Sequence, residues 1–380
     1  MDLMRTPKSL DLTITNRCNL RCLYCSHFSS AADVEIELPT AEWTQFFEEL
    51  NRCAVMDVSL GGGEPFLRKD LKDLIQSLVE NRLRYSILTN GTLITREMAT
   101  FIAGTKRCNS VQVSIDGSTS EVHDLCRGKG NFEKAVRGAR HLLDSGVRTT
   151  VRVTIHKNNV GDLDNVAQFL LEEMKLPGFS TNSASHMGLC RQNANIVQLS
   201  VDDRIRAMES LVNLSRKYEG RISALAGPLA EAKHWATMVE ARKSGKESLA
   251  NFGFLTACNG PLKKLAVRPD GVIVPCGQLS HLELGRINKD SLLEVWQNHP
   301  ELKRLRERHK IPLDQFDFCK GCEYRMYCTG GCPATAYTFF GKDEHPSPDF
   351  CLRQFLLNGG NLPKTVLTGS GDTRGEKTYG

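Results

Sequence analysis

Three of the chain's fourteen cysteines lie in one short stretch, Cys18-Asn19-Leu20-Arg21-Cys22-Leu23-Tyr24-Cys25. Three thiolates at this spacing suit one soft metal centre, because thiolate is a preferred ligand of zinc and of iron–sulfur clusters. If the centre is a four-iron cluster, three cysteines leave one iron without a protein ligand, and that iron can bind a small molecule. Zinc and a simple group of buried thiols are the alternatives that the stretch alone leaves open.

The composition is that of a soluble globular protein. The chain has 380 residues, of which 40% are hydrophobic and 24% charged, enough for one large α/β domain and a smaller module. The net charge of +5 is spread along the chain, which fits an acidic peptide partner and does not argue for nucleic acid. We find no stretch of transmembrane length and no signal peptide, so we expect a cytoplasmic protein without a membrane partner. In such a protein many cysteines indicate metal rather than disulfides.

Apolar β-type runs alternate with segments of helical period up to residue 217. The predicted strands cover residues 9–15, 55–60, 84–88, 110–115, 147–155 and 178–182. The predicted helices cover residues 39–52, 70–81, 95–103, 131–145, 163–174 and 200–217. This alternation predicts a parallel sheet with right-handed crossovers, and six units are too few to close an eight-fold barrel. We therefore predict an α/β fold, a partial (β/α)6 TIM-like barrel.

Changes of pattern divide the chain into four segments. The barrel is expected to cover residues 1–220, a helical connection 221–251, a second cysteine-rich domain 252–358 and a disordered tail 359–380. The second domain is distinguished by short strands and by many Gly and Pro residues. The tail is rich in Gly and polar residues, which cannot form a packed core.

Each short motif of the barrel falls directly after a predicted strand. These motifs are Gly61-Gly62-Gly63-Glu64-Pro65, Leu88-Thr89-Asn90-Gly91, Ser114-Ile115-Asp116-Gly117 and, further on, His123-Asp124-Leu125-Cys126-Arg127. Because the carboxyl ends of parallel strands meet at one edge of a sheet, we expect the motifs to lie together. Taken alone, the first also fits a tight turn with a solvated glutamate, and the second an Asx-type helix start.

The cysteine stretch and the strand-end motifs together resemble the signature of radical S-adenosylmethionine (SAM) enzymes. The resemblance implies that Cys18, Cys22 and Cys25 hold a [4Fe-4S] cluster whose open iron binds the methionine end of SAM. Electron transfer then cleaves SAM to a 5′-deoxyadenosyl radical. The implied SAM contacts are Tyr24 against the adenine, Gly62, Gly63 and Glu64 at the amino group, Asn90, Ser114 and Asp116 beside the ligand, and Arg127 at the carboxylate.

The second cysteine set resembles the seven-cysteine SPASM domain. Its core is Cys319-x2-Cys322-x5-Cys328-x3-Cys332, with Cys351 after it and Cys258 and Cys276 before it. The resemblance implies two auxiliary [4Fe-4S] clusters. Cys319, Cys322, Cys328 and Cys351 would hold the outer cluster, and Cys258, Cys276 and Cys332 the inner one. Zinc is the alternative, because paired Cys-x2-Cys spacings also build zinc ribbons.

The inner cluster departs from fully ligated relatives, because Phe252 stands where they carry a further cysteine. Either one iron is open to a substrate thiolate, or a ligand comes from elsewhere. Cys126 and Cys190 are candidate catalytic residues outside both patterns. Cys190 follows the sixth predicted strand, where a thiol could give a hydrogen atom to a substrate radical or complete the inner cluster. Packing as a small hydrophobe is the alternative for both.

The resemblance covers nearly the whole chain and implies a maturase of a ribosomally made peptide, which forms a thioether or carbon–carbon cross-link or epimerises a residue. Pro177-Gly178-Phe179-Ser180 resembles maturases of the SynChlorMet cassette type. Sulfatase-type protein maturation, cofactor biosynthesis by the same chemistry and a non-catalytic metal-stabilised binding module are the alternatives. The implied partners are the precursor peptide, a reductant such as ferredoxin or flavodoxin, and, since no leader-recognition domain precedes the first strand, a separate leader-binding protein.

Overall fold

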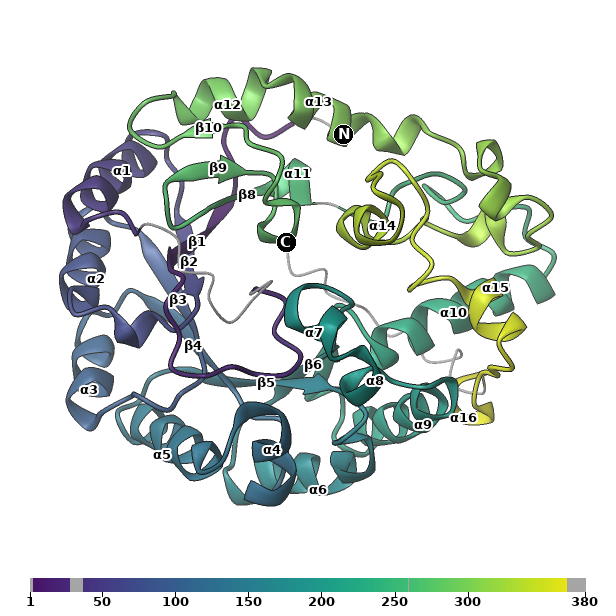
Figure 1. Cartoon of the computed structure of the whole chain (residues 1–380), viewed down its shortest axis with the longest axis horizontal. Coiled ribbons are helices and arrows are strands. Elements are labelled where there is room, and N and C mark those ends of the chain that lie inside the picture. The colour runs from purple at the N-terminus through teal and green to yellow at the C-terminus, as the bar shows by residue number, and fades with distance from the viewer. Residues whose placement is uncertain (1–2, 28–36, 259, 368–380) are drawn as a thin grey trace.

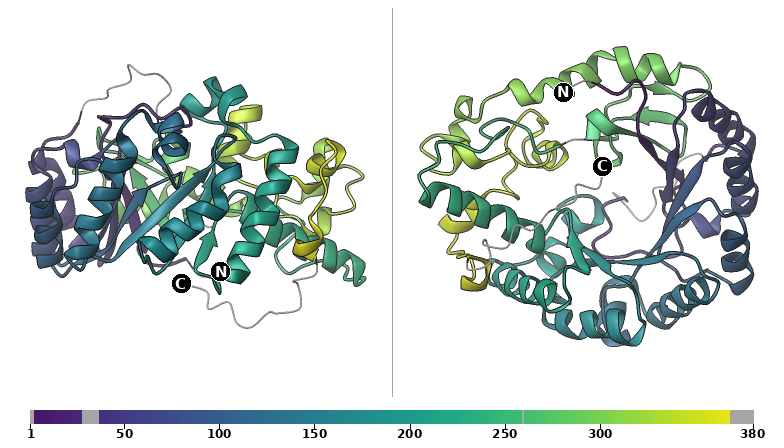
Figure 2. Two further views of the ribbon diagram at one scale, coloured as in Figure 1. Left: turned by 90° about the horizontal axis from the view of Figure 1, so that it is seen from below. Right: turned by 180° about the vertical axis from the view of Figure 1, so that it is seen from behind.

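The computed structural model of the chain describes residues 3–27, 37–258 and 260–367. Its elements form a ring with strands on the inside and most helices on the outside (Figure 1). Two further views show that the later part of the chain, green to yellow, continues this ring beside the barrel strands (Figure 2). Within the described residues, no helix combines the length and apolar character needed to cross a membrane.

One ten-stranded sheet runs through the protein in the order β10-β9-β8-β1-β2-β3-β4-β5-β6-β7. The strands are β1 Ser9–Thr15, β2 Asp57–Gly62, β3 Arg84–Thr89, β4 Cys108–Ser114, β5 Thr149–Ile155, β6 Phe179–Ser183, β7 Ile222–Ala224, β8 Lys264–Val267, β9 Val272–Val274 and β10 Gly285–Arg286. All neighbours from β8 through β1 to β7 pair in parallel, and β8-β9 and β9-β10 are antiparallel. The predicted parallel (β/α)6 partial barrel is confirmed.

The described helices lie mostly on the outside of the ring (Figure 1). They are α1 Thr40–Arg52, α2 Leu71–Glu80, α3 Arg96–Gly104, α4 Ser120–Arg127, α5 Asn131–Asp144, α6 Leu163–Gln168, α7 Gly188–Gln192, α8 Ala194–Val197, α9 Val201–Lys217, α10 Pro228–Lys243, α11 Gly260–Lys263, α12 Leu292–Asn298, α13 Pro300–Glu307, α14 Pro333–Phe340, α15 Leu352–Leu357 and α16 Lys364–Leu367. A π-helical turn, Phe169–Glu173, continues α6. All six helices predicted for the barrel are present.

The two faces of the sheet differ in character. On β1, Leu10, Leu12 and Ile14 are buried in the main core, and Asp11 and Thr13 on the opposite face are only half-buried. Helix α1 joins that core with an apolar stripe of Trp43, Phe46, Phe47 and Leu50, whose spacing of three and four residues places them on one side of the helix. The outer face therefore makes the core, and the inner face is left for the central cavities.

The structure differs from the expected boundaries at three places. Residues 222–224 form β7 and extend the barrel sheet, because their backbone pairs with β6, so the connection is not wholly helical. The sequence His123 to Arg127, expected as a loop, is the second half of α4. The tail expected from residue 359 begins with ordered chain, because α16 buries Val366 against α9 and α10. Residues 368–380 lie outside the described residues.

Arg68 links the end of β1 to the start of α2 from a buried position. Its Nη1 donates to the carbonyl oxygens of Ile14 (2.7 Å) and Leu38 (3.2 Å), and its Nη2 contacts Asp70 Oδ2 at 2.6 Å. Hydrogen bonding from Arg68 lowers the pKa of Asp70 to about 2. The guanidinium thus satisfies backbone carbonyls that water cannot reach.

We expect Arg68→Met to lower the free energy of unfolding by about 3 kcal/mol, because it leaves buried acceptors unpaired. Arg96→Met is the matched control, since Arg96 is exposed and lies 3.8 Å from Asp144, and such pairs contribute ~0–1 kcal/mol.

The folded-state pKa of Asp70 is depressed, so its contribution is complete above about pH 4 and is lost as the pH falls toward the folded pKa. Urea unfolding at neutral and acidic pH should show that the loss of unfolding free energy caused by Arg68→Met becomes smaller in acid. A loss that does not depend on pH would contradict the ion pair.

Candidate functional site

Residues 16–27, here called the cysteine loop, follow β1 and are held from both sides. The Leu23 amide donates to the Cys126 carbonyl on α4 (3.0 Å), and the Leu189 amide on α7 donates to the Cys25 carbonyl (2.9 Å). The Asn193 side-chain amide adds a bond to the Leu23 carbonyl (3.0 Å). These contacts fix the backbone that carries the three thiols.

A cavity of about 270 Å³ brings the cysteine loop and the strand ends together. The predicted residues that line it are Cys18, Tyr24, Cys22, Cys25, Gly62, Gly63, Asn90, Ser114 and Arg127. Sequence reasoning missed Thr154 near the end of β5 and Asn182 and Ser183 at the end of β6, which line the same cavity. Their position at strand ends was the available signal, and they carry no motif.

The glycines of the β2 motif accommodate the chain's own backbone. A Cβ on Gly62 would lie 2.1 Å from the Thr15 carbonyl oxygen, and one on Gly63 would lie 2.2 Å from that of Arg17. The amide of Gly63 donates to Thr15 (2.8 Å). We expected the glycines to allow close approach of a ligand; in the structure they let the cysteine loop cross the end of β2.

The structure gives Glu64 a different neighbourhood from the one expected. Its carboxylate is fully buried and accepts bonds from the Thr89 hydroxyl (2.7 Å), the Asn90 amide (2.7 Å) and the Phe66 amide (3.2 Å). Burial raises the pKa of Glu64 to about 7, although these hydrogen bonds act to lower it. Through these bonds Glu64 joins the ends of β2 and β3, and it is not among the residues that line the cavity. Its contact with an ammonium group stays a prediction.

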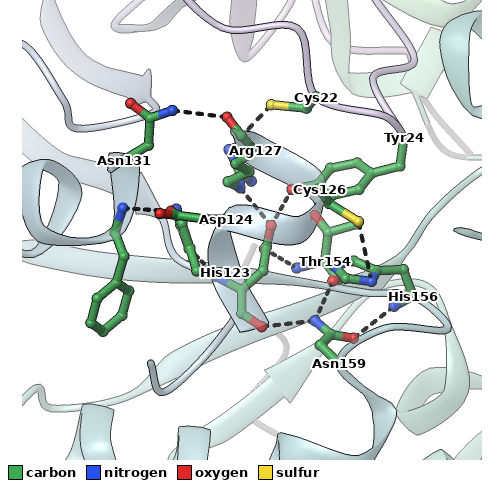
Figure 3. Close-up of polar contacts among 12 residues, drawn as sticks. Cys22, Tyr24, His123, Asp124, Cys126, Arg127, Asn131, Thr154, His156 and Asn159 are labelled. Atoms are coloured by element: carbon green, nitrogen blue, oxygen red, sulfur yellow. Dashed lines mark hydrogen bonds and ion pairs between the residues drawn. The ribbon is translucent and has the colours of Figure 1, made fainter. Parts of the chain in front are cut away.

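Asp116 is the centre of a buried polar network beneath the cysteine loop. Figure 3 labels its neighbours Tyr24, Arg127 and Thr154. Asp116 Oδ2 accepts from the Tyr24 hydroxyl and from Arg127 Nε (2.5 Å), and its Oδ1 accepts from the Thr154 amide (2.8 Å). Its own amide donates to His123 Nδ1 (3.1 Å). Burial alone would raise the pKa of Asp116, but the charge of Arg127 reverses the shift and lowers it. Asp116 therefore stays ionised and acts through Tyr24 and Arg127.

Arg127 combines this ion pair with a place on the cavity wall. Its guanidinium lies 5.4 Å from the centre of the Tyr24 ring, and its Nη1 lies 3.9 Å from Cys22 Sγ. Burial acts to lower the pKa of Arg127, but Asp116 holds it well above its ordinary value. Burial also raises the pKa of Cys22 to about 12, with Arg127 opposing. The permanent positive charge suits a carboxylate or a metal-bound thiolate.

The two candidate catalytic cysteines do not reach the cavity. Cys126 and Cys190 are 1% and 0% exposed and form one apolar cluster with Tyr24 and Val197. Cys126 Sγ lies 3.6 Å from His156 Nδ1, and burial raises the pKa of Cys190 to about 11. Neither is among the residues that line the two central cavities, and both pack beneath the cysteine loop, so a catalytic role for either thiol stays a prediction.

The predicted outer cysteines share one site. Cys319, Cys322, Cys328 and Cys351 all line a small cavity of about 20 Å³ in the later domain. Burial raises the pKa of Cys319 to about 12, and the other three thiols raise it further. Four thiols around one void form a donor set that fits a four-iron cluster.

The predicted inner cysteines also lie close enough to influence one another. Burial raises the pKa of Cys258, and Cys332 and Cys276 add to the rise. Phe252 packs on His234 of α10, with ring centres 5.7 Å apart, so this position supplies packing. Across residues 3–27, 37–258 and 260–367, no three His, Cys, Asp or Glu side chains are arranged to hold a metal ion as they stand.

A larger cavity of about 1140 Å³ lies between the barrel and the later domain. It shares Ser26 and Gly62 with the smaller cavity, so the two lie next to each other. Its described lining includes Arg191 and Arg268 and two histidines, but no Asp or Glu. Arg268 is itself paired with Asp270 (2.6 Å) and Glu283 (2.9 Å).

The chain is similar to known proteins over most of its length. The family model of the radical SAM superfamily matches residues 12–170, and that of the iron–sulfur cluster-binding SPASM domain matches residues 258–323. The mycofactocin maturase of Mycolicibacterium smegmatis is 36% identical over 90% of this chain and 82% of that protein. The Fe-coproporphyrin III synthase of Methanosarcina barkeri is 28% identical over 87% of this chain and 84% of that protein. The crystal structure of Streptococcus suis SuiB bound to precursor peptide SuiA is similar in fold, with a TM-score of 0.70 at 18% identity, covering 92% of this chain and 77% of that one.

We expect Gly63→Ala to lower the free energy of unfolding by about 1–3 kcal/mol, because the new methyl group meets the Arg17 backbone, which cannot move without displacing the cysteine loop. Gly61→Ala is the matched control: its Cβ would lie no closer than 3.6 Å to Leu88 Cδ1, so a change within about 0.5 kcal/mol is expected. Chemical unfolding with limited proteolysis of the loop measures both. Equal stability of the two variants would contradict the tight crossing.

Proposed function

Because the chain belongs to the radical SAM superfamily and carries its iron–sulfur cluster-binding SPASM domain, we propose that it cleaves SAM reductively and uses the resulting radical to modify a ribosomally made peptide. The chain is a radical SAM enzyme, which excludes a non-catalytic binding module. The SPASM match also decides for iron over zinc in the later domain. The observation that carries the proposal is the cavity in which three cysteines meet the ends of the barrel strands.

We assign the first cluster to Cys18, Cys22 and Cys25, because all three line one cavity on a fixed loop. When bound, a [4Fe-4S] cluster with an open iron supplies the electron and the site at which SAM is held. Arg127 supports the assignment because it is cationic, lines the cavity and can pair with the SAM carboxylate. Asp116 keeps that guanidinium and the Tyr24 ring in place, and Gly62 and Gly63 leave room beside the loop.

The later domain is proposed to hold two further [4Fe-4S] clusters. The shared cavity of Cys319, Cys322, Cys328 and Cys351 supports the outer one. The mutual influence of Cys258, Cys276 and Cys332 supports the inner one. Since Cys190 lies in the apolar cluster under the cysteine loop and Phe252 packs on His234, we propose an open iron at the inner cluster.

The large cavity is proposed to receive the substrate, since it adjoins the cavity of the cysteine loop and is also lined by residues of the later domain. A peptide is the first candidate, because the bacterial relative of highest identity given above is a maturase and its match spans most of both chains. A carboxylate-bearing tetrapyrrole is the second candidate, as in the archaeal relative's name. It is favoured by a described lining that includes Arg191 and no Asp or Glu.

A reduced ferredoxin or flavodoxin is proposed as the electron donor, and a separate protein as the binder of the peptide's leader segment. We propose the cytoplasm as the place of reaction, because none of the fourteen cysteines forms a disulfide, as expected in a reducing compartment. Sulfatase-type maturation is a further variant of the same proposal, since it uses the same radical chemistry on another protein substrate.

Anaerobic reconstitution should give about 12 iron atoms per chain, four for each cluster, and 5′-deoxyadenosine should form on adding SAM and dithionite. Replacing Cys18, Cys22 and Cys25 together by Ala should abolish 5′-deoxyadenosine and leave about 8 iron atoms. The double variant Cys53→Ala/Cys108→Ala is the control, because neither cysteine belongs to a proposed ligand set. Stoichiometric zinc, without visible iron–sulfur absorption, would refute the proposal.

An open iron at the inner cluster should accept an added thiolate, because thiolates bind iron tightly. In the variant that lacks Cys18, Cys22 and Cys25, we expect the electron paramagnetic resonance (EPR) signal of the inner cluster to change on adding a short acetylated cysteine peptide. The same peptide with Ser should leave the signal unchanged. An identical response to both peptides, or a structure showing a fourth protein ligand, would rule out the open site.

A further inference from the structure

Arg308 is a buried cation with two guanidinium nitrogens that have no hydrogen-bond partner among the described residues. It opens the 3₁₀ turn Arg308–Lys310 after α13 and is 3% exposed. Its Nε and Nη2 are buried and have no hydrogen-bond partner within the described part of the chain. Burying a guanidinium unpaired costs several kcal/mol, because the charge loses its hydration. A charge or acceptor beyond the described protein atoms is therefore expected beside it.

The carboxylates near Arg308 are already engaged. Asp343 and Glu344 lie within its electrostatic range. Both are held by Arg304, which contacts the two oxygens of Asp343 at 3.1 and 2.7 Å and Glu344 Oε1 at 2.8 Å. Arg304 is thus hydrogen-bonded to both carboxylates, but because it also pairs with Glu301, its one charge does not cancel theirs. Their charges still act on Arg308, although its Nε and Nη2 have no hydrogen-bond partner within the described residues.

The remaining acidic groups around Arg308 are thiols of the inner set. Burial lowers the pKa of Arg308, and Cys258 is the first group that opposes this shift, with Cys332 also contributing. The backbone supports this neighbourhood, because α13 packs on α11, which begins two residues after Cys258. The guanidinium therefore belongs to the surroundings of the inner cysteines.

A second cation, Lys264, lies near the inner cysteines and, unlike Arg308, forms an ion pair. Lys264 on β8 lies within electrostatic range of Cys276 and Cys258. Its Nζ contacts Asp11 Oδ2 on β1 at 2.5 Å. Lys264 and Asp11 offset each other, whereas the buried Nε and Nη2 of Arg308 have no hydrogen-bond partner in the described part of the chain.

We propose that Arg308 is the built-in counter-cation of the inner auxiliary cluster. The inference rests on the proposed function, because it requires a [4Fe-4S] cluster at Cys258, Cys276 and Cys332. A cluster held by thiolates is negatively charged, and reduction adds another negative charge, so a buried cation favours the reduced state and raises the reduction potential. The same charge favours a thiolate at an open iron. Arg308 touches neither SAM nor substrate and is a positioning residue.

The first test is a redox titration followed by EPR in the variant that lacks Cys18, Cys22 and Cys25, where only the auxiliary clusters contribute. The signal absent after Cys258→Ala identifies the inner cluster. At a given applied potential, Arg308→Gln should reduce the ratio of reduced to oxidised inner cluster by about tenfold or more. This corresponds to lowering the reduction potential of the cluster by about 59 mV, for transfer of one electron. Arg308→Lys should stay near the parent, because the charge is kept.

Lys310→Gln is the matched control for the loss of one positive charge. Lys310 lies in the same turn but is exposed and paired with Glu307 at 2.7 Å, so the potential should not change. If Arg308→Gln keeps its full iron content and the reduction potential of its inner cluster equals the parent's, the role of Arg308 is overturned while the cluster assignment stands. A parent protein without the inner cluster's signal would overturn the cluster itself, and the role of Arg308 with it.

Thermal unfolding of the metal-free protein gives a second measurement that needs no cluster. If Arg308 lacks a partner there, Arg308→Met should raise the melting temperature of the metal-free protein, because a buried unpaired charge is removed. The gain in melting temperature on reconstitution should then be smaller than in the parent. A lower melting temperature of metal-free Arg308→Met would show that the protein itself pairs the guanidinium, and would overturn the proposal.

Discussion

The buried carboxylate of Asp116 holds together the parts on which the SAM cavity depends. It receives the Tyr24 hydroxyl from the cysteine loop, the Arg127 guanidinium from α4 and the Thr154 amide from β5. A fully buried carboxylate is stable only when such donors surround it, so the network is maintained as a unit. Asp116 thereby holds the cysteine loop through Tyr24 and keeps the Arg127 guanidinium at the wall of the cavity.

Joining the later domain to the barrel depends on the sheet. Strand β8 pairs in parallel with β1, so residues from two distant parts of the chain share one backbone ladder. The outer face of this sheet is covered by apolar helical stripes such as that of α1, and the inner face keeps half-buried side chains such as Thr13. The large cavity therefore lies between the inner face of this sheet and the later domain, next to the cavity of the cysteine loop.

Much of the barrel and its site could be predicted, because strand alternation and strand-end motifs are local patterns. Tyr24, Asn90, Ser114 and Arg127 line the cavity as that logic requires. What the sequence did not show has a common cause, since it concerns what fills the space around a side chain. Glu64 is used by neighbouring backbone amides and a threonine hydroxyl, and Cys190 packs under the loop. Strand β7 was missed because three residues carry too little pattern.

The sequence by itself determined the candidate ligands, because the three thiols of residues 18–25 are neighbours along the chain and, together with the strand-end motifs, resemble the radical SAM signature. Only the tertiary structure decided which charges surround each centre. Arg308 meets the inner cysteines, and Lys264 meets Asp11 across 253 positions of sequence. Electrostatic interaction depends on distance in space and on burial, and neither is encoded in local spacing. For that reason the ligands could be found in the sequence, and the counter-charges only in the fold.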